Sequence, residues 1–423
     1  MKDIIKKTNE CLSCIKKPCT EGCPLNNDIP KFIKLVKEDK VEEAYKVLLN
    51  TTVLPSICGR ICPKERQCQG SCVKRIKGLP VEIGNIESYI GDYSIKNNLK
   101  LPSKKLNKYK VAVIGSGPAS LTCAAFLRRE GYNVTIYEKY DYLGGLLVHG
   151  IPDFRLDKKI VKESIEKILD TGINVEYNME LSNNLLLEDL EKEYDAIFIG
   201  IGSNISRKMN IEGEALNGVY GGNELLEKEI KLDYKDKTVI VSGGGNVAID
   251  VARVVKRQNA KKVIIVYRRS KEEMPADEIE LNQALKDGVE ILYQTNILKI
   301  NGTDKVENIE VIKTELVKKE NEIRLTPVNI EGTNYNIKCD YVMMAVGSIA
   351  DNNITTKLNL ELDKNNKIIV NDKYQTSNKK IFAGGDIANV EATVAYAARS
   401  GRDAAISIME YLNERWYKER IFN

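Results

Sequence analysis

The chain has 423 residues, of which 43% are hydrophobic, so it is long enough for about two to four domains with buried cores. Its 64 basic and 60 acidic residues leave a net charge of +4, a near-balance that by itself favours no polyanionic partner. The single histidine, His149, excludes any metal site with two histidines and indicates that cofactors carry the chemistry.

The start of the chain, MKDIIKKTNE, is polar and charged and lacks the apolar region of a signal peptide. No apolar run reaches the roughly 18–20 residues that a membrane span needs. We therefore expect a cytoplasmic protein with no membrane or nucleic-acid partner.

Eight of the ten cysteines lie in the first 72 residues, as C-x2-C-x4-C-x3-C-P and C-x3-C-P-x4-C-x3-C. They are Cys11, Cys14, Cys19 and Cys23, followed by Cys58, Cys62, Cys68 and Cys72. A reducing cytoplasm disfavours four disulfides. Two zinc sites remain an alternative, although structural zinc usually takes paired C-x2-C spacings and only one occurs here. Two [4Fe–4S] clusters fit best, because ferredoxin-type runs ending in Cys-Pro share their thiolates between two clusters.

Short helices are expected around these cysteines. Apolar residues recur at helical spacing within DIPKFIKLVKEDKVEEAYKVLLN, which predicts two helices with Asp28 as the first N-cap. PVEIGNIESYIGDYSI predicts a third helix. The polar, lysine-rich NNLKLPSKKLNKYK then predicts a linker.

Residues 110–138 have the strand, glycine turn, helix and strand of a dinucleotide-binding unit. KVAVI leads into GSGPAS, where Gly115 permits the tight turn and Gly117 lets a pyrophosphate approach the helix N-terminus. NVTIYE ends at Glu138, which can accept hydrogen bonds from ribose hydroxyls. Ser120 replaces the third glycine of the fingerprint and is small enough for close helix–strand packing.

Paired glycines in GGLLVHGIP, at 144–152, indicate another close approach of backbone to cofactor, and His149 there is interpreted as a packed loop residue. The strand DAIFIGIGS, at 195–203, ends in small residues that can pass beneath a dinucleotide. The candidate cofactor-binding residues of this first site are Gly115, Gly117, Pro118, Ala119, Glu138, Gly145 and Leu146.

The same unit repeats at residues 237–267, from KTVIVS through GGGNVA to KKVIIVY. Here the second strand is followed by Arg268 and Arg269 where the first unit has an acidic residue. A carboxylate favours a free 2′-hydroxyl, whereas arginine accommodates a 2′-phosphate. The first site is therefore predicted to bind FAD and the second NADPH. The candidate residues of the second site are Gly243, Gly245, Asn246, Val247, Arg268 and Arg269.

The C-terminal region predicts two further buried strands, YVMMAVGS and KIFAGGDIA. Gly385 and Asp386 are placed to bind the ribityl or phosphate side of a flavin. The helix that begins near Thr393 can direct its positive end toward the flavin pyrimidine.

The motifs together resemble the glutamate synthase small (beta) subunit family. This family includes the NADPH-binding subunit of ferredoxin:NADP transhydrogenase and the flavin subunit of dihydropyrimidine dehydrogenase. The resemblance rests on the cysteine spacings, PVEIGNIESY, GSGPAS, GGLL with GIPDFRL, GGGNVAID, VYRRSKEEMPA, and AGGD with TVAYAARSGRDAA. It departs from the family pattern at Ser120 and His149, where glycine and tyrosine are expected.

The resemblance implies an α/β fold with a helical iron–sulfur domain and two Rossmann-like domains of the glutathione-reductase type. The implied boundaries are 1–105 for two [4Fe–4S] clusters, 106–235 with 345–423 for FAD, and 236–344 for NADPH. It implies that Cys11, Cys14, Cys19 and Cys72 hold one cluster. It also implies that Cys23, Cys62 and Cys68 hold the other, with Glu87 favoured over Cys58 as the fourth ligand.

The implied function is an electron conduit in which NADPH reduces FAD, and electrons pass through the clusters to a catalytic partner subunit or a ferredoxin-like acceptor in a hetero-oligomer. No catalytic side chain is predicted, because the cofactors carry the chemistry. The alternatives are the flavin subunit of a dihydropyrimidine dehydrogenase, a ferredoxin:NADP oxidoreductase, or a flavoprotein with a zinc-stabilised docking module.

Overall fold

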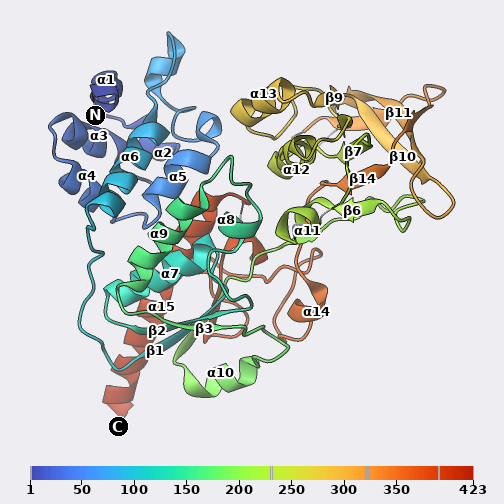
Figure 1. Cartoon of the computed structure of the whole chain (residues 1–423). Helices are drawn as coiled ribbons and strands as arrows, with labels where there is room; N and C mark the ends of the chain where they lie inside the picture. Colours follow the sequence, from blue (N-terminus) through green and yellow to red (C-terminus); the bar gives the residue numbers. More distant parts are fainter. Residues whose placement is uncertain (1, 229, 231, 320–323, 389–390, 423) are drawn as a thin grey trace. The chain divides into compact units, whose positions relative to one another are not determined.

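The computed structural model describes residues 2–228, 230, 232–319, 324–388 and 391–422. The chain forms two compact units (Figure 1). Unit 1 comprises Met1–Val148, Asp153–Ser203 and Ala350–Asn423, and unit 2 comprises His149–Pro152 and Asn204–Ile349. In the described residues, no helix combines the length and the apolar character needed to cross a lipid bilayer.

The cysteine-rich part of unit 1 is helical. Its α-helices are α1 Lys2–Asn9, α2 Pro18–Glu21, α3 Ile29–Lys37, α4 Val41–Leu48, α5 Pro55–Ile61 and α6 Ile83–Lys96, with 3-10 turns η1 Lys64–Arg66 and η2 Val73–Ile76. The three helices predicted here are confirmed as α3, α4 and α6. Asp28 occupies the N-cap position of α3, but its carboxylate makes no capping bond and instead accepts from Lys17 Nζ at 2.8 Å.

A five-stranded parallel sheet forms the rest of unit 1, in the order β16-β4-β1-β2-β3. The strands are β1 Lys110–Ile114, β2 Asn133–Glu138, β3 Asn174–Tyr177, β4 Ala196–Ile199 and β16 Ile381–Ala383. The helices are α7 Pro118–Arg129, α8 Leu146–His149, α9 Lys158–Leu169, α10 Leu187–Glu193, α14 Asn352–Thr355 and α15 Val394–Phe422, with the 3-10 turn η3 Gly385–Ile387. Helices α7, α9 and α15 lie on one face and α10 on the other (Figure 1), which buries the strands as a parallel sheet requires.

Long basic side chains on α9 and α15, which cover this sheet, form hydrogen bonds with the helical part of unit 1. Lys167 of α9 donates to the Ser94 hydroxyl and carbonyl of α6, both at 3.0 Å, and to the Leu99 carbonyl at 2.6 Å. Arg402 of α15 donates to the Leu25 carbonyl, two residues after a cysteine, at 2.8 Å. These bonds hold the cysteine loops against the helices that cover the five-stranded sheet, within one compact unit.

Unit 2 contains a second five-stranded parallel sheet, in the order β6-β14-β7-β8-β9. Its strands are β6 Val219–Gly221, β7 Thr238–Ser242, β8 Lys262–Val266, β9 Glu290–Leu292 and β14 Tyr341–Met344. Helices α11 Gly222–Glu227, α12 Asn246–Arg257 and α13 Glu278–Lys286 accompany it. An antiparallel sheet is built from β10 Thr295–Asn301, β11 Asn308–Val317, β12 Thr326–Asn329 and β13 Tyr335–Lys338, and β5 Ile205–Ser206 pairs with β15 Ser348–Ile349.

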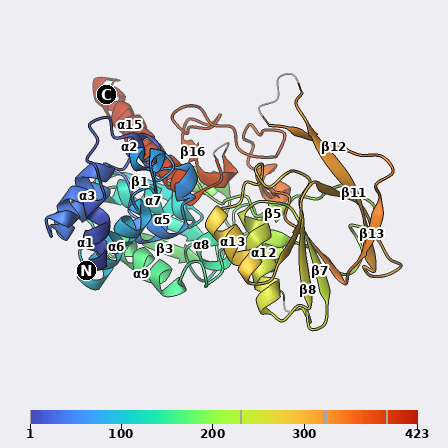
Figure 2. The same ribbon diagram turned by 90° about the horizontal axis from the view of Figure 1, so that it is seen from above.

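The parallel sheet of unit 2 is covered on both faces (Figure 2). Val239 and Val241 pack toward α12, whereas Ile240 packs against the antiparallel strands. Alternation of side chains along a strand produces this division. The one buried arginine described in this unit, Arg253 on α12, pairs with Glu280 and Asp287.

Candidate functional site

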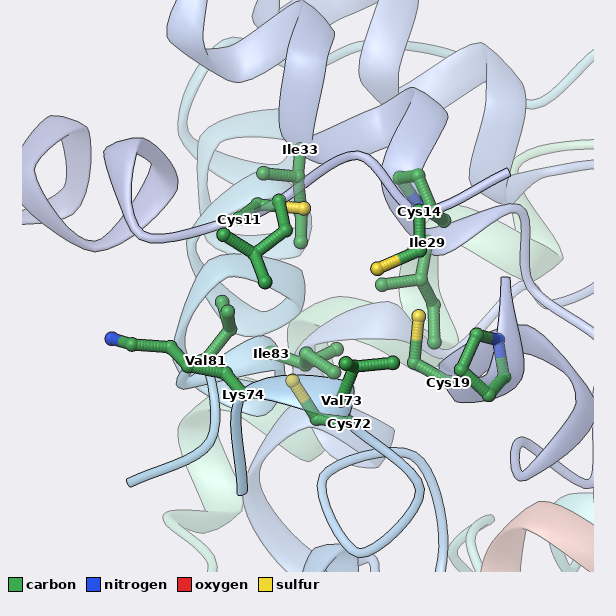
Figure 3. Close-up of a pocket in the computed structure, with 13 residues that line it drawn as sticks. Cys11, Cys14, Cys19, Ile29, Ile33, Cys72, Val73, Lys74, Val81 and Ile83 are labelled. Carbon is green, nitrogen blue, oxygen red and sulfur yellow. The ribbon is translucent and has the colours of Figure 1, made fainter. Parts of the chain in front are cut away.

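Four cysteine side chains converge in a pocket of the helical part, which we call site I. Cys11 and Cys14 come from the loop after α1, Cys19 from α2, and Cys72 from the residue before η2. Their sulfur atoms face a common space (Figure 3). All four residues are half-buried. Burial, together with the nearby Cys11 and Cys72, raises the pKa of Cys19 to about 11.

A second group, site II, gathers Cys23, Cys62 and Cys68 around Glu87 of α6. Burial raises the pKa of Cys23 to about 12, and Glu87 and Cys62 add to the shift. Burial likewise raises the pKa of Cys68, with Glu87, Cys23 and Cys62 contributing. Burial raises the pKa of Glu87 itself to about 8. The four implied ligands therefore lie within electrostatic reach of one another.

Cys58 lies beside site II and is buried, with 1% of its surface exposed. Its hydrogen bond with Cys62 is the leading cause of the raised pKa of Cys62, ahead of burial. Glu87, by contrast, acts on Cys23, Cys62 and Cys68 alike. This geometry favours Glu87 as the fourth donor and leaves Cys58 as a neighbour of Cys62.

Polar side chains lie around Glu87 at site II, and the sequence patterns did not predict them. Asn27 Nδ2 donates to Glu87 Oε1 at 3.1 Å, and the Thr51 hydroxyl donates to Asn27 Oδ1 at 2.5 Å. Lys64 Nζ donates to the Gly59 and Arg60 carbonyls, and its positive charge partly offsets the rise in the pKa of Glu87 that burial causes. Asn27 and Glu87 are 60 residues apart, so no local pattern in the sequence could have paired them.

The donor sets fit iron–sulfur clusters chemically. A buried group of thiols and a carboxylate is costly unless cations offset its charge. Among the described residues, no three His, Cys, Asp or Glu side chains converge on the position of a single metal ion. A single ion would need such convergence, whereas the thiolates of a [4Fe–4S] cluster bind separate irons.

The first glycine turn is built for close approach to a phosphate. Gly115 has φ +87°, and a Cβ there would lie 2.7 Å from the Gly200 carbonyl oxygen. A Cβ on Gly117 would meet open space, directly before helix α7, and Gly145 lies close to Gly117. Ser120 Oγ donates to the Gly200 carbonyl at 3.3 Å, so serine retains the close helix–strand packing expected of the third glycine.

Glu138 is buried at the end of β2, where Ser116 Oγ donates to its Oε2 at 2.5 Å and Tyr140 N to its Oε1 at 3.0 Å. Ser116 also accepts from Gly144 N at 3.0 Å, which ties the turn, the acidic residue and the paired glycines together. Sequence reasoning did not assign Ser116 this role, although its place inside the fingerprint was a usable signal. The remaining residues of this site lie at the start of α7, in Pro118 and Ala119, and at the start of α8, in Leu146.

The C-terminal turn joins the same site. Gly385 has φ +71°, its N–H donates to Ser400 Oγ at 2.8 Å, and a Cβ on it would lie 3.1 Å from Ala119 Cβ. Burial raises the pKa of the neighbouring Asp386, and the positive charge of Lys367 partly offsets this rise. Thr393 Oγ1 accepts from Tyr396 N at 3.3 Å and so caps the start of α15. A half-buried acidic side chain at this turn fits the hydroxyl donors of a sugar-like chain.

The second glycine turn lies in unit 2, between β7 and α12. Gly243 has φ +136°, and a Cβ there would lie 2.1 Å from the Ala345 carbonyl oxygen. Gly245 faces open space before Asn246 and Val247 begin α12. Asn246 Oδ1 accepts from Asp277 N at 2.8 Å, so this side chain also braces the loop before α13.

The two predicted phosphate-binding arginines differ in their surroundings. Arg268 is exposed after β8, and its carbonyl accepts from the Thr314 hydroxyl at 2.8 Å. Arg269 is half-buried, and its Nε donates to the Leu325 carbonyl at 3.0 Å. His149 is grouped with unit 2, and its Nε2 lies 4.0 Å from Glu227 Oε1.

Two family models match the chain. Residues 109–401 match pyridine nucleotide-disulphide oxidoreductases, and residues 1–99 match dihydropyrimidine dehydrogenase domain II, 4Fe-4S cluster. The structure is similar to that of Mycobacterium tuberculosis FprA in complex with NADPH, at 19% sequence identity. That match covers 74% of this chain and 86% of the FprA chain, with a TM-score of 0.66. This likeness confirms the predicted dinucleotide-binding fold.

Two curated relatives are similar along nearly the whole chain. The glutamate synthase [NADPH] small chain of Escherichia coli (strain K12) is 35% identical, over 96% of this chain and 91% of its own length. The protein of the same name from Azospirillum brasilense is 33% identical, over 96% of this chain and 88% of its own length. The fold, the two glycine turns, the cysteine sites and these similarities agree, and the chain belongs to the glutamate synthase [NADPH] small chain family.

Proposed function

We propose that this chain is the electron-input subunit of an NADPH-dependent oxidoreductase of the glutamate synthase type, with FAD and two [4Fe–4S] clusters. One observation carries the proposal: the first glycine turn and both cysteine sites belong to one compact unit. In this proposal residues 1–105 hold the clusters, 106–235 and 345–423 hold FAD, and 236–344 hold NADPH.

FAD held at the first turn would supply the chemistry that takes up a hydride from NADPH and releases its two electrons one at a time. The chain's own residues would bind this cofactor and fix its orientation. The open backbone at Gly117 and the first turn of α7 accept the pyrophosphate, and Glu138, held by Ser116, accepts from the adenosine ribose. Asp386 would accept hydrogen bonds from the ribityl hydroxyls, and the N-terminus of α15, capped by Thr393, would stabilise negative charge on a bound flavin.

The second turn, in unit 2, selects NADPH. Open backbone at Gly245 admits the pyrophosphate at the start of α12. Arg268 has an exposed guanidinium that can take the 2′-phosphate through two parallel hydrogen bonds. Arg269 adds charge and fixes its own position through the Leu325 carbonyl.

At the cysteine sites the residues provide ligands and charge balance. Site I supplies four thiolates, from Cys11, Cys14, Cys19 and Cys72. Site II supplies Cys23, Cys62, Cys68 and the carboxylate of Glu87. The Asn27 amide holds one Glu87 oxygen, which leaves the other available to iron.

The terminal reaction belongs to a partner. The relatives are named small chains, and this implies a larger chain in the same enzyme. We propose a hetero-oligomer in which the catalytic subunit accepts the electrons.

Anaerobic purification with iron, acid-labile sulfide and flavin analysis tests the proposal. About eight irons and one FAD per chain are expected, with full bleaching of the flavin by NADPH. Cys14→Ser should lower the iron content to about four, whereas Cys339→Ser, a buried cysteine of unit 2, should leave it unchanged. Zinc in place of iron, or a flavin that NADPH does not reduce, would overturn the function.

A further inference from the structure

The four most exposed large apolar side chains described in this structure occur in two short segments. Ile15 is 97% exposed, Leu79 82%, Ile76 80% and Leu12 63%, and Val73 beside them is 39% exposed. We call these five residues the apolar patch. Single exposed apolar residues are ordinary on a protein surface, but a concentration of them marks an interaction site.

The two segments meet at site I. Cys11 and Cys14 lie on one side of the pocket, and Cys72 and Val73 lie on the other (Figure 3). Leu12 also lines this pocket. An ion pair between Lys74 and Glu10 ties the segments together next to the cysteines. The patch therefore borders the thiols of site I.

The two segments that carry the patch are basic. Residues 11–17 and 73–79 contain five basic side chains and no acidic one. Lys17 and Lys74 pair with acidic residues elsewhere. Lys16, Arg75 and Lys77 are exposed and form what we call the basic rim.

Site I is also the more accessible of the two cysteine sites. All four of its cysteines are half-buried, whereas site II has one half-buried cysteine, Cys62, and two buried ones, Cys23 and Cys68, which are 8% and 7% exposed. Electron transfer rates fall steeply with distance, so an external protein exchanges electrons best with site I. The inference that electrons are exchanged at site I rests on the proposed function, because it requires a cluster at site I.

We propose that the apolar patch and its basic rim form the docking surface for one electron-exchanging partner protein, which presents an acidic rim around an apolar centre. Charge complementarity of this kind steers encounter and fixes orientation. A second copy of this chain does not fit, because two basic rims would face each other. An anionic membrane has the same sign of charge as the proposed partner and could also bind the basic rim. The test therefore includes membrane binding as a separate outcome.

The test uses the anaerobic holoenzyme and a bacterial two-[4Fe–4S] ferredoxin as an acidic one-electron probe. Two pre-reduced ferredoxins deliver two electrons, and with one proton they convert NADP⁺ to NADPH on the enzyme. The variants are Arg75→Glu with Lys77→Glu for the rim and Ile76→Asp for the patch. Leu186→Asp, at an exposed apolar residue of unit 1 far along the chain, is the matched control.

Reversing two rim charges should slow ferredoxin oxidation about tenfold or more at low salt, and the difference should shrink as salt rises. Ile76→Asp should slow it at all salt concentrations, and Leu186→Asp should not. Iron content and NADPH oxidation by the neutral quinone menadione should stay at wild-type values in every variant. The single variant Lys16→Glu keeps the test valid if the double variant does not fold.

Equal ferredoxin rates in patch, rim and control variants would overturn the proposal, as would a wild-type holoenzyme that exchanges no electrons with ferredoxin. Binding to phosphatidylserine vesicles that the variants lose, with ferredoxin rates unchanged, would assign the patch to a membrane instead. Failure of the proposed function looks different: the wild-type protein would lack iron or would not oxidise NADPH with menadione.

Discussion

Replacing Arg268 with alanine should separate NADPH binding from protein stability. The guanidinium is exposed, and the described contact of this residue within unit 2 is made by its carbonyl, which the substitution retains. A hydrogen bond to a charged group contributes about 1.5–3 kcal/mol. Since 1.4 kcal/mol is a factor of ten, NADP⁺ should bind roughly 10- to 150-fold more weakly. NAD⁺, which lacks the 2′-phosphate, should bind as before.

Arg269→Ala should behave differently, because it also removes the bond from Nε to the Leu325 carbonyl. Its stability should fall by about 1 kcal/mol in addition to the loss of NADP⁺ affinity. Calorimetric titration of both nucleotides and urea unfolding measure the two effects. Lys261→Ala, at the opposite end of β8, is the charge-matched control. Equal weakening of NADP⁺ and NAD⁺ by Arg268→Ala would refute the 2′-phosphate assignment.

Three further outcomes are expected. Glu87→Ala should reduce the iron content from about eight to about four, whereas Cys58→Ser should leave it unchanged; the reverse result in iron analysis would make Cys58 the ligand. Arg253→Met leaves two half-buried carboxylates without their arginine and should cost about 3–5 kcal/mol in urea unfolding. Burial lowers the pKa of Lys167 to about 8 from 10.5, so between these values the unfolded chain binds a proton that the folded chain has released. Stability should therefore gain a contribution as pH rises through this window, and Lys167→Met should remove that gain, measured as urea midpoints across the window.

The strand–turn–helix units were predictable because their signals are local. The strand over 110–114 and the strand over 133–138 appear with the predicted bounds, since β-branched runs, glycine turns and helical periodicity are contained within a few residues. The turn residues were predictable for the same reason. Gly115 and Gly243 have positive φ and lie against a neighbouring strand's carbonyl oxygen.

Features that depend on distant residues were not predictable from patterns. The bond between Asn27 and Glu87, and the contact of Arg402 with the Leu25 carbonyl, join residues that only the folded chain brings together. Asp28 shows another limit, because an available lysine competes with the backbone N–H groups of α3 for its carboxylate. The apolar patch was not predictable from the sequence either, since isoleucine and leucine in a short loop resemble core residues until their exposure is known.

The return of the chain from unit 2 to unit 1 has a consequence for biosynthesis. Strand β16 and helix α15 complete the first sheet, and a Cβ on Gly401 of α15 would lie only 1.9 Å from the Ala119 carbonyl oxygen of α7. Because a ribosome adds about 5–20 residues per second, β1 to β4 emerge well before β16 and α15. The helical cysteine region and unit 2 can therefore fold while the first sheet still exposes its apolar edge. During that interval β4 lacks its partner strand β16, and the first site lacks Gly385, Asp386 and the start of α15.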